Sequence, residues 1–117
     1  MPDQAQDGDY VELLNESELW DGEMEAYDVG AAEVLVVKID GQICAFDGIC
    51  PHQSSSLVEG DLEDGILTCS AHEWQFDVRS GESVNPRGER LIRHDVTVDG
   101  DGTVRVRLSA RTTARSR

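Results

Sequence analysis

Two short segments, each with one cysteine and one histidine, restrict the folds open to this chain more than any other part of its sequence. The first segment is CPHQ, with Cys50 and His52, and the second is CSAH, with Cys69 and His72. Their spacing is C-x-H, sixteen residues, and C-x-x-H. Thiolate and imidazole groups both bind transition metals. A chain that holds one metal centre with all four side chains must fold so that the two segments face each other.

The sequence around these segments is typical of short antiparallel strands. Apolar or alternating runs recur at close spacing, namely YVELL, EMEAYDV, EVLVVKI, QICAF, DGIL, WQFDV, IRHDVTV and TVRVRL. Asp40 and Gly41 separate two of these runs, and this dipeptide favours a hairpin with a type I′ turn. Further hairpins are predicted around Ser80 and Gly81 and around the DGDG segment at 99–102. We therefore expect an all-β fold, an antiparallel sandwich or barrel.

A few segments interrupt the predicted strands. Asn15 is expected to cap one turn of helix that Gly22 closes. The segments CPHQSSSLVEGDLE, at 50–63, and NPRGER, at 85–90, are predicted to be loops because of their Pro, Gly and Ser content. The first of these loops carries Cys50 and His52, so one half of the metal-binding pattern lies on a connection rather than on a strand.

The length of 117 residues fits a single domain. We expect this domain to span residues 9–108, preceded by a polar leader at 1–8. The tail at 109–117 is basic and poor in apolar residues, so it is predicted to be disordered.

The charge of the chain excludes several classes of partner. It has 24 acidic residues against 10 Lys and Arg, which gives a formal net charge of -14. Binding to nucleic acid or to an anionic membrane requires clustered cations and is not expected. The sequence shows neither a signal peptide nor a long apolar run, so we predict a soluble, cytoplasmic protein. Three cysteines in such a chain favour a metal site or catalysis over a disulfide framework.

The pattern of ligands is compatible with two kinds of metal centre. One is a zinc site with two cysteines and two histidines, which would make the chain a zinc-stabilised interaction module. Against zinc, the pairs are mixed, the first gap is the single residue Pro51, and little helix is predicted. The other is a 2Fe–2S cluster of the Rieske type, in which two cysteines bind one iron and two histidines bind the other. Each segment supplies one ligand of each kind, so both segments would contact both irons.

The residues CPHQ and CSAHEW resemble the cluster motifs of Rieske ferredoxins, and the resemblance covers nearly the whole domain. Within that family, the segments LWDGEMEAYDV, EVLVVK, GILTCSAHEWQF and NP are similar to the ferredoxin components of toluene-4-monooxygenase and of alkene and isoprene monooxygenases. These ferredoxins serve soluble, multicomponent monooxygenases that contain a di-iron hydroxylase.

The resemblance implies a Rieske-type β fold with a cluster-binding subdomain formed by two loops, at about residues 48–76. It implies one 2Fe–2S cluster per chain. Cys50 and Cys69 would bind the inner iron, and His52 and His72 would bind the outer iron near the surface.

The resemblance also assigns residues around the cluster. Pro86, in the NPRGER segment, would lie on a third loop and cover the cluster. Trp74 would pack beside the second cluster loop and keep water from the sulfides, although it could equally be an ordinary core residue. Ferredoxins of ring-hydroxylating dioxygenases usually carry CTHG in the first motif and a glycine in place of this tryptophan. Gln53 and Trp74 therefore favour the di-iron monooxygenase branch.

The function implied by the resemblance is transport of single electrons, not catalysis. The chain would accept electrons from an NADH-dependent flavin reductase and deliver them, as a monomer, to a di-iron hydroxylase that oxidises an aromatic hydrocarbon, an alkene or isoprene. Docking would be transient, with a small and partly polar interface. The alternative within the same redox class is a ferredoxin for a ring-hydroxylating dioxygenase.

Three further residues are given ordinary structural roles. Cys44 lies on a predicted strand away from both loops and is expected to be a buried free thiol. His94 lies beside Arg93 and Asp95, where an exposed or ion-paired histidine is expected. Trp20 is predicted to pack beneath the N-terminal turn.

Overall fold

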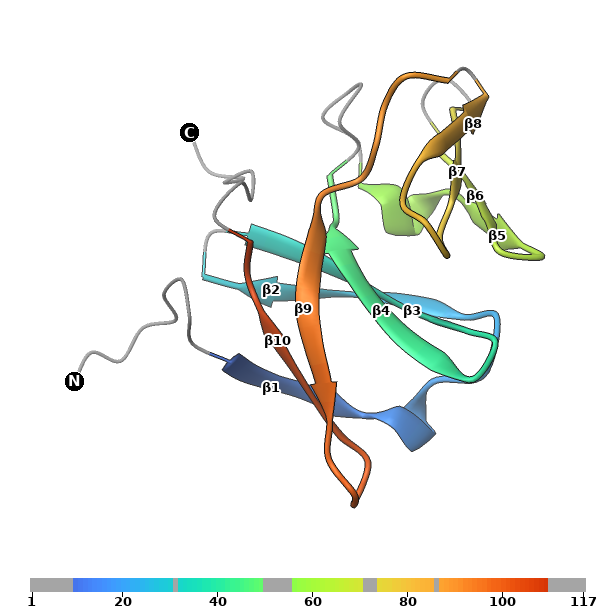
Figure 1. The fold of residues 1–117 in the computed structure, drawn as a ribbon. Coiled ribbons are helices and arrows are strands. Elements are labelled where there is room, and N and C mark those ends of the chain that lie inside the picture. Colours follow the sequence, from blue (N-terminus) through green and yellow to red (C-terminus); the bar gives the residue numbers. More distant parts are fainter. Residues whose placement is uncertain (1–9, 31, 50–55, 71–73, 86, 110–117) are drawn as a thin grey trace.

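The computed structural model describes residues 10–30, 32–49, 56–70, 74–85 and 87–109 (Figure 1). It confirms the predicted all-β fold. The strands are β1 (Tyr10–Asn15), β2 (Met24–Val29), β3 (Ala32–Ile39), β4 (Gln42–Asp47), β5 (Asp61–Glu63), β6 (Ile66–Thr68), β7 (Gln75–Asp77), β8 (Ser83–Asn85), β9 (Arg93–Val98) and β10 (Thr103–Arg107). Two short 3-10 helices are η1 (Glu16–Glu18) and η2 (Leu57–Glu59). No helix within the described ranges is long and apolar enough to cross a membrane.

The strands form two antiparallel sheets of unequal size. The large sheet has the order β1-β10-β9-β4-β3-β2, and the small sheet has the order β5-β6-β7-β8. Figure 1 shows the small sheet at the end of the large sheet toward which β4 runs. The small sheet includes the part of the chain that carries Cys69, so it corresponds to the expected cluster-binding subdomain.

The large sheet curves around its own hydrophobic core. Leu14 of β1 and Val29 of β2, which lie on the two edge strands, belong to the same buried cluster. A flat sheet would hold its edge strands far apart, so the shared cluster requires a nearly closed barrel. The interior of this barrel is filled by Leu14, Leu19, Val29, Val34, Val36, Ala45, Val104 and Val106.

A second buried cluster joins the two sheets. Its members come from β3, β4, η2, β6 and β7 and from three connecting segments: Leu35, Val37, Ile39, Phe46, Leu57, Leu67, Cys69, Phe76, Val78 and Leu91. Strand β3 therefore contributes to both clusters, with Val34 and Val36 on one face and Leu35 and Val37 on the other. This double burial explains why EVLVVKI is a continuous apolar run rather than an alternating one.

The predicted turns are confirmed where the sequence carries Asp-Gly. Asp40 and Gly41 have φ angles of 55° and 76°, as a type I′ turn requires, and they join β3 to β4. The Asn15 side chain caps η1 by accepting a hydrogen bond from the Ser17 N–H at 3.0 Å.

The prediction that residues 50–63 form one loop is wrong at its end. Asp61–Glu63 is strand β5, which pairs with β6 across a turn at Asp64 and Gly65, and η2 precedes it. Asp64 and Gly65 have φ angles of 56° and 81°. The dipeptide thus forms a hairpin turn rather than the beginning of a strand. A three-residue strand with two acidic residues gives too short an alternation to recognise.

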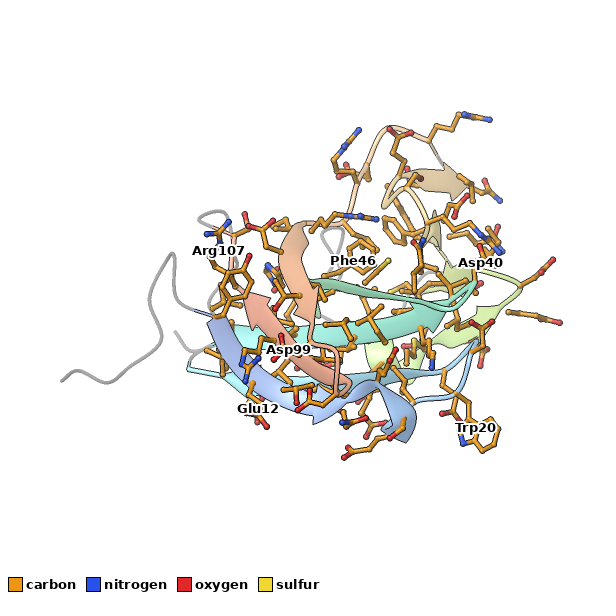
Figure 2. The ribbon with its side chains drawn as sticks, turned by 60° about the horizontal axis from the view of Figure 1, so that its bottom comes forward. Glu12, Trp20, Asp40, Phe46, Asp99 and Arg107 are labelled. Atoms are coloured by element: carbon orange, nitrogen blue, oxygen red, sulfur yellow. The ribbon has the colours of Figure 1, made fainter. Side chains whose placement is uncertain are left out.

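The prediction that Trp20 packs beneath the N-terminal turn is also wrong. Its side chain is 77% exposed, and Figure 2 shows it projecting outward at the edge of the molecule. Leu19, the preceding residue, fills the core at this turn instead. The turn itself is held by two hydrogen bonds between Trp20 and Glu23, of 2.9 and 3.0 Å.

His94 differs from expectation as well, because it is buried rather than exposed. It lies on β9 opposite Ala45 of β4, with only 3% of its surface exposed. Its Nδ1 accepts a hydrogen bond from the Ser109 N–H at 3.0 Å. Strand β9 is interior to the large sheet, so its inward side chains are covered. Burial lowers the pKa of His94 to about 4, and the nearby Asp95 carboxylate opposes this shift only in part.

This burial predicts a loss of stability in mild acid. The folded state keeps His94 neutral until about pH 4, whereas the unfolded chain takes up a proton near pH 6.5. The unfolded state binds more protons in this window, so the contribution is complete above about pH 6.5 and is lost as the pH falls. We expect the free energy of unfolding to decrease by roughly 2 kcal/mol between about pH 7.5 and pH 5 from this residue.

The measurement is urea unfolding of the cluster-loaded protein and of the His94→Gln variant at both pH values. Glutamine stays neutral, and its side-chain oxygen can accept the bond from the Ser109 N–H. The loss between the two pH values should be smaller in the variant by that amount. Equal losses in both proteins would contradict the assignment of a depressed pKa to His94.

Candidate metal centre

The first cysteine-histidine segment is closed at its base by backbone pairing. Ile49 and Ser56 form an antiparallel bridge shortly after β4, so the residues on either side of the segment 50–55 lie next to each other. The predicted ligands Cys50 and His52, and also Gln53, lie outside the described residues. The structure therefore fixes the two ends of this loop.

A buried glutamate anchors both ends of the first loop to β3. The Gly48 N–H donates to the Glu33 carbonyl at 2.7 Å, and the Ser56 hydroxyl donates to Glu33 Oε1 at 3.1 Å. The Gly48 carbonyl in turn accepts from the Leu57 N–H at 2.8 Å. A Cβ at position 48 would lie 2.9 Å from the Glu33 side chain, so only glycine allows this approach. Spacing arguments could not reveal Glu33, because its contacts depend on the folded hairpin.

The second segment is closed in the same way. Thr68 of β6 pairs with Gln75 of β7, and the Cys69 N–H donates to the Trp74 carbonyl at 2.7 Å. The β6–β7 hairpin is thus closed at Cys69 and Trp74. His72 lies outside the described residues.

Cys69 is held at the inner side of this tip. Only 1% of its surface is exposed, and its side chain belongs to the hydrophobic cluster between the two sheets. The thiol is not in a disulfide. A cysteine that is shielded from water and held by backbone hydrogen bonds is suited to bind the inner metal ion of a metal centre. The Cys69 thiol therefore fits the metal centre that the sequence predicts.

The two loops meet at their bases. Leu57, which follows the first loop, is fully buried in the same cluster as Cys69. Gly60 then passes so close to the second loop that a Cβ there would lie 2.0 Å from the Thr68 carbonyl oxygen and 3.3 Å from the Cys69 Cα. The structure thus brings the attachment points of the two segments together, as a shared metal centre requires. Sequence reasoning missed Gly60, because it looked like an ordinary loop glycine.

The position of Trp74 is compatible with both roles considered for it, that of a core residue and that of a residue that shields the metal centre from water. Its ring stacks on Phe76 with centroids 6.5 Å apart, and it packs against the cluster between the sheets while staying partly exposed. Its carbonyl also closes the second loop at Cys69. The half-buried Trp74 side chain therefore lies beside the second loop. Pro86, the other residue predicted to cover the metal centre, lies outside the described residues.

The rest of the described chain offers no competing centre. Among the described residues, no group of three or more His, Cys, Asp and Glu side chains could hold a metal ion. Cys44, the other described cysteine, is a free thiol on β4 and is half-buried against the same hydrophobic cluster. The predicted free thiol is thus confirmed, whereas its predicted burial is only partial.

Comparison with known proteins identifies the kind of centre. A sequence profile of the Rieske [2Fe-2S] domain matches residues 9–105. The ferredoxin component of the alkene monooxygenase system of Xanthobacter autotrophicus is 52% identical over 101 residues, which are 85% of this chain and 83% of that protein. The match decides between the two metal centres that the spacing left open, in favour of the 2Fe–2S cluster over zinc.

Solved structures support the same family. The ferredoxin of carbazole 1,9a-dioxygenase from Nocardioides aromaticivorans IC177 has a TM-score of 0.76 at 28% identity, and the alignment covers 86% of this chain and 98% of that one. A complex of reduced oxygenase and oxidised ferredoxin in carbazole 1,9a-dioxygenase contains a similar chain, with a TM-score of 0.76, 28% identity, and 84% and 92% coverage. The chain belongs to the Rieske [2Fe-2S] domain family, as an electron-carrying ferredoxin with a 2Fe–2S cluster and not as an enzyme.

Proposed function

We propose that this chain is the Rieske ferredoxin of a multicomponent monooxygenase. It accepts single electrons from an NADH-dependent flavin reductase and delivers them to a di-iron hydroxylase that oxidises a hydrocarbon. The observation that carries this proposal is the 52% identity to the ferredoxin of an alkene monooxygenase system over most of both chains. The solved ferredoxin of carbazole 1,9a-dioxygenase has a similar fold, but its sequence is only 28% identical to this chain.

The ligands in this proposal are Cys50 and Cys69 for one iron and His52 and His72 for the other. When bound, a cluster with this mixed ligation supplies one-electron transfer at a higher potential than a cluster with four cysteines. The burial of Cys69 and the closure of both loops support the assignment. The protein's own contribution is to hold the ends of the two loops in place and to keep water from the inner side of the centre, where Trp74 and Phe76 pack.

The charge of the chain favours partners with basic docking surfaces. A formal net charge of -14 accelerates encounter with a cationic surface and makes the encounter sensitive to salt. The proposal therefore includes a basic docking face on the hydroxylase and on the reductase. It places docking in the cytoplasm and requires neither a membrane nor nucleic acid.

The second candidate function is electron delivery to a ring-hydroxylating dioxygenase. The specific observation in its favour is the similarity to a ferredoxin that has been solved in complex with its oxygenase. Gln53 and Trp74 distinguish the two functions at the level of the motif, because dioxygenase ferredoxins usually carry glycine at both positions.

The test is reconstitution with purified partners. The cluster-loaded protein is combined with NADH and a flavin reductase, and then with either a di-iron alkene hydroxylase or a dioxygenase oxygenase component. We expect product formation coupled to NADH oxidation with the hydroxylase, at a rate that falls as salt is added. Turnover with the dioxygenase component and none with the hydroxylase would replace the proposed function by the second candidate.

A further inference from the structure

The two loops that carry the cluster motifs are attached to the sheets in different ways. The loop at 50–55 leads from β4 of the large sheet to η2 and β5, so it starts on the large sheet, whereas both ends of the loop at 69–74 lie on β6 and β7 of the small sheet. The placement of one loop relative to the other therefore depends on how the small sheet is oriented on the large one. Any interaction that fixes this orientation acts on the metal centre from a distance.

The hydrophobic cluster between the sheets holds them together without fixing their orientation in detail. It includes Phe46 from the large sheet and Leu67 and Phe76 from the small sheet. Apolar burial is not directional, so directional contacts define the angle between the sheets. One set of such contacts lies at the base of the first loop, where Gly48, Ser56 and Leu57 are hydrogen-bonded.

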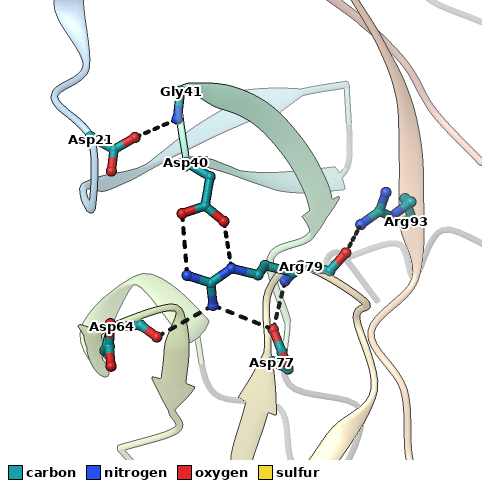
Figure 3. Close-up of polar contacts among 7 residues, drawn as sticks. All are labelled: Asp21, Asp40, Gly41, Asp64, Asp77, Arg79 and Arg93. Atoms are coloured by element: carbon teal, nitrogen blue, oxygen red, sulfur yellow. Dashed lines mark hydrogen bonds and ion pairs between the residues drawn. The ribbon is translucent and has the colours of Figure 1, made fainter.

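Arg79 supplies such a contact (Figure 3). It lies in the turn between β7 and β8, and its guanidinium reaches the β3–β4 turn of the large sheet. Arg79 Nε donates to Asp40 Oδ2 at 2.6 Å, and Nη2 donates to Asp40 Oδ1 at 3.3 Å. Two parallel bonds between a planar guanidinium and a carboxylate fix an angle as well as a distance. This hydrogen-bonded pairing also lowers the pKa of Asp40, which keeps the carboxylate charged.

The same guanidinium is held within the small sheet. Arg79 Nη1 donates to the Asp64 carbonyl at 3.4 Å and lies 4.0 Å from Asp77 Oδ1. A Cβ at Gly65 would lie 2.0 Å from Nη1, so the guanidinium occupies the space that the missing side chain leaves. Arg79 thus joins two Asp-Gly turns, one from each sheet.

The backbone of Arg79 is tied to the large sheet as well. Arg93 of β9 donates from Nη2 to the Arg79 carbonyl at 3.0 Å. The other end of the contact is also braced, because the Gly41 N–H donates to Asp21 Oδ1 at 2.6 Å. The pair therefore joins two turns whose positions are already restricted.

We propose that Arg79 is a positioning residue that sets the orientation of the small sheet on the large sheet through Asp40, and thereby the relative placement of the two cluster loops. This inference rests on the proposed assignment of the cluster ligands to the loops at 50–55 and 69–74. Arg79 does not contact the described part of the metal centre and acts only through the sheets that carry it.

The first experiment compares Arg79→Gln with Arg105→Gln in the cluster-loaded protein. Arg105 is the matched control: it also forms a half-exposed pair with an aspartate, Asp99, and it lies 3.9 Å from Glu12 of β1, so both of its partners belong to the large-sheet half of the protein. The side chains of Arg79 and Arg105 are 42% and 37% exposed. The readouts are iron release to a chelator, the electron paramagnetic resonance g values of the reduced protein, and amide hydrogen exchange in β5 to β8.

For Arg79→Gln we expect iron release and exchange in the small sheet to be about threefold faster, the size that loss of one exposed, bidentate ion pair allows. The g values should shift, because the ligand geometry at the metals changes. Arg105→Gln should match the wild type in all three readouts. Wild-type behaviour of Arg79→Gln, or an equal change in Arg105→Gln, would overturn the proposal.

The second experiment tests whether Arg79 acts through Asp40. Asp40→Asn removes the charge but keeps the turn, because asparagine tolerates a positive φ. The double variant that combines Arg79→Gln with Asp40→Asn should release iron no faster than Arg79→Gln alone. The rate of iron release from Arg79→Lys should lie between those of the wild type and Arg79→Gln, because lysine cannot form the paired bonds. Additive effects in the double variant would rule out the link.

These results are separable from a failure of the ligand assignment. Faster exchange in the small sheet with unchanged iron release and g values would overturn the positioning role and leave the ligands untouched. An incorrect ligand set would instead be revealed by a cysteine variant that keeps its iron, whatever the rates of amide hydrogen exchange in the small sheet.

Discussion

The Cys69→Ala variant is expected to bind almost no 2Fe–2S cluster. Alanine has no donor atom, and the buried position of Cys69 leaves no room for solvent or another side chain to replace the sulfur. Iron and acid-labile sulfide per chain should fall by about tenfold or more, because the loss of even an outer-shell partner of a metal ligand lowers metal affinity by about 10- to 100-fold. The variant should also be colourless in the visible range. The measurements are metal analysis, visible absorption and electron paramagnetic resonance of protein purified under reducing conditions.

Cys44→Ala is the matched control for this prediction. Cys44 is also a free cysteine and packs against the same hydrophobic cluster, so the two variants lose the same atoms. We expect Cys44→Ala to bind a full complement of the 2Fe–2S cluster and to lose only about 1 kcal/mol of unfolding free energy. Circular dichroism then shows whether the cluster-free Cys69→Ala chain keeps its β structure. A Cys69→Ala protein with two irons per chain and an unchanged spectrum would remove Cys69 from the ligand set.

The fold was predictable where a short sequence pattern determines the local structure. The Asp40–Gly41 turn required residues that tolerate positive φ, and the structure has both of them in that conformation. The apolar run of β3 indicated a buried strand, although only the structure shows that its two faces serve two different clusters. Local pattern and tertiary environment agree at these elements, which is why the prediction held.

Other residues could not be assigned because neighbours distant in sequence decide their environment. Leu19 and Trp20 are adjacent, and nothing in the local pattern says which one enters the core; the structure buries Leu19 and exposes Trp20. His94 and Val96 lie on the same face of β9, so the two-residue period of the strand offered a signal for the burial of His94. The charged neighbours Arg93 and Asp95 outweighed that signal, although they face the opposite side of the strand.

The kind of metal centre was predictable from the sequence, and the residues that support its loops were not. Cysteine and histidine at fixed spacing indicate a chemistry, and the burial of Cys69 agrees with it. The residues that hold the loops in place, among them Glu33, Gly60 and Arg79, act across long stretches of sequence. A single sequence contains no signal for such contacts, because each residue type is also common in ordinary loops and on surfaces.

Gly60 provides the second large expected effect. Gly60→Ala should reduce the free energy of unfolding by about 3 kcal/mol, the upper part of the usual range for overpacking, because its Cβ would overlap a backbone oxygen and no side chain can move aside. The conflict falls on the Thr68 carbonyl, 2.0 Å from that Cβ, and the adjacent Cys69 Cα, 3.3 Å away. The strain is therefore directed at the residue that begins the second cluster loop, and we expect faster loss of the cluster to a chelator as well.

Gly100→Ala is the control for this effect. Gly100 also lies in a loop, but an added Cβ there would meet nothing within 4 Å, and its φ is not in the left-handed region. Its unfolding free energy should stay within about 0.5 kcal/mol of the wild type, as for most substitutions at unconstrained surface sites. Urea unfolding of both variants, followed by fluorescence and by visible absorption, separates a global effect from one at the metal centre. If Gly60→Ala behaved like Gly100→Ala in both signals, the close approach of Gly60 to Thr68 and Cys69 would not contribute to the stability of the protein or of its metal centre.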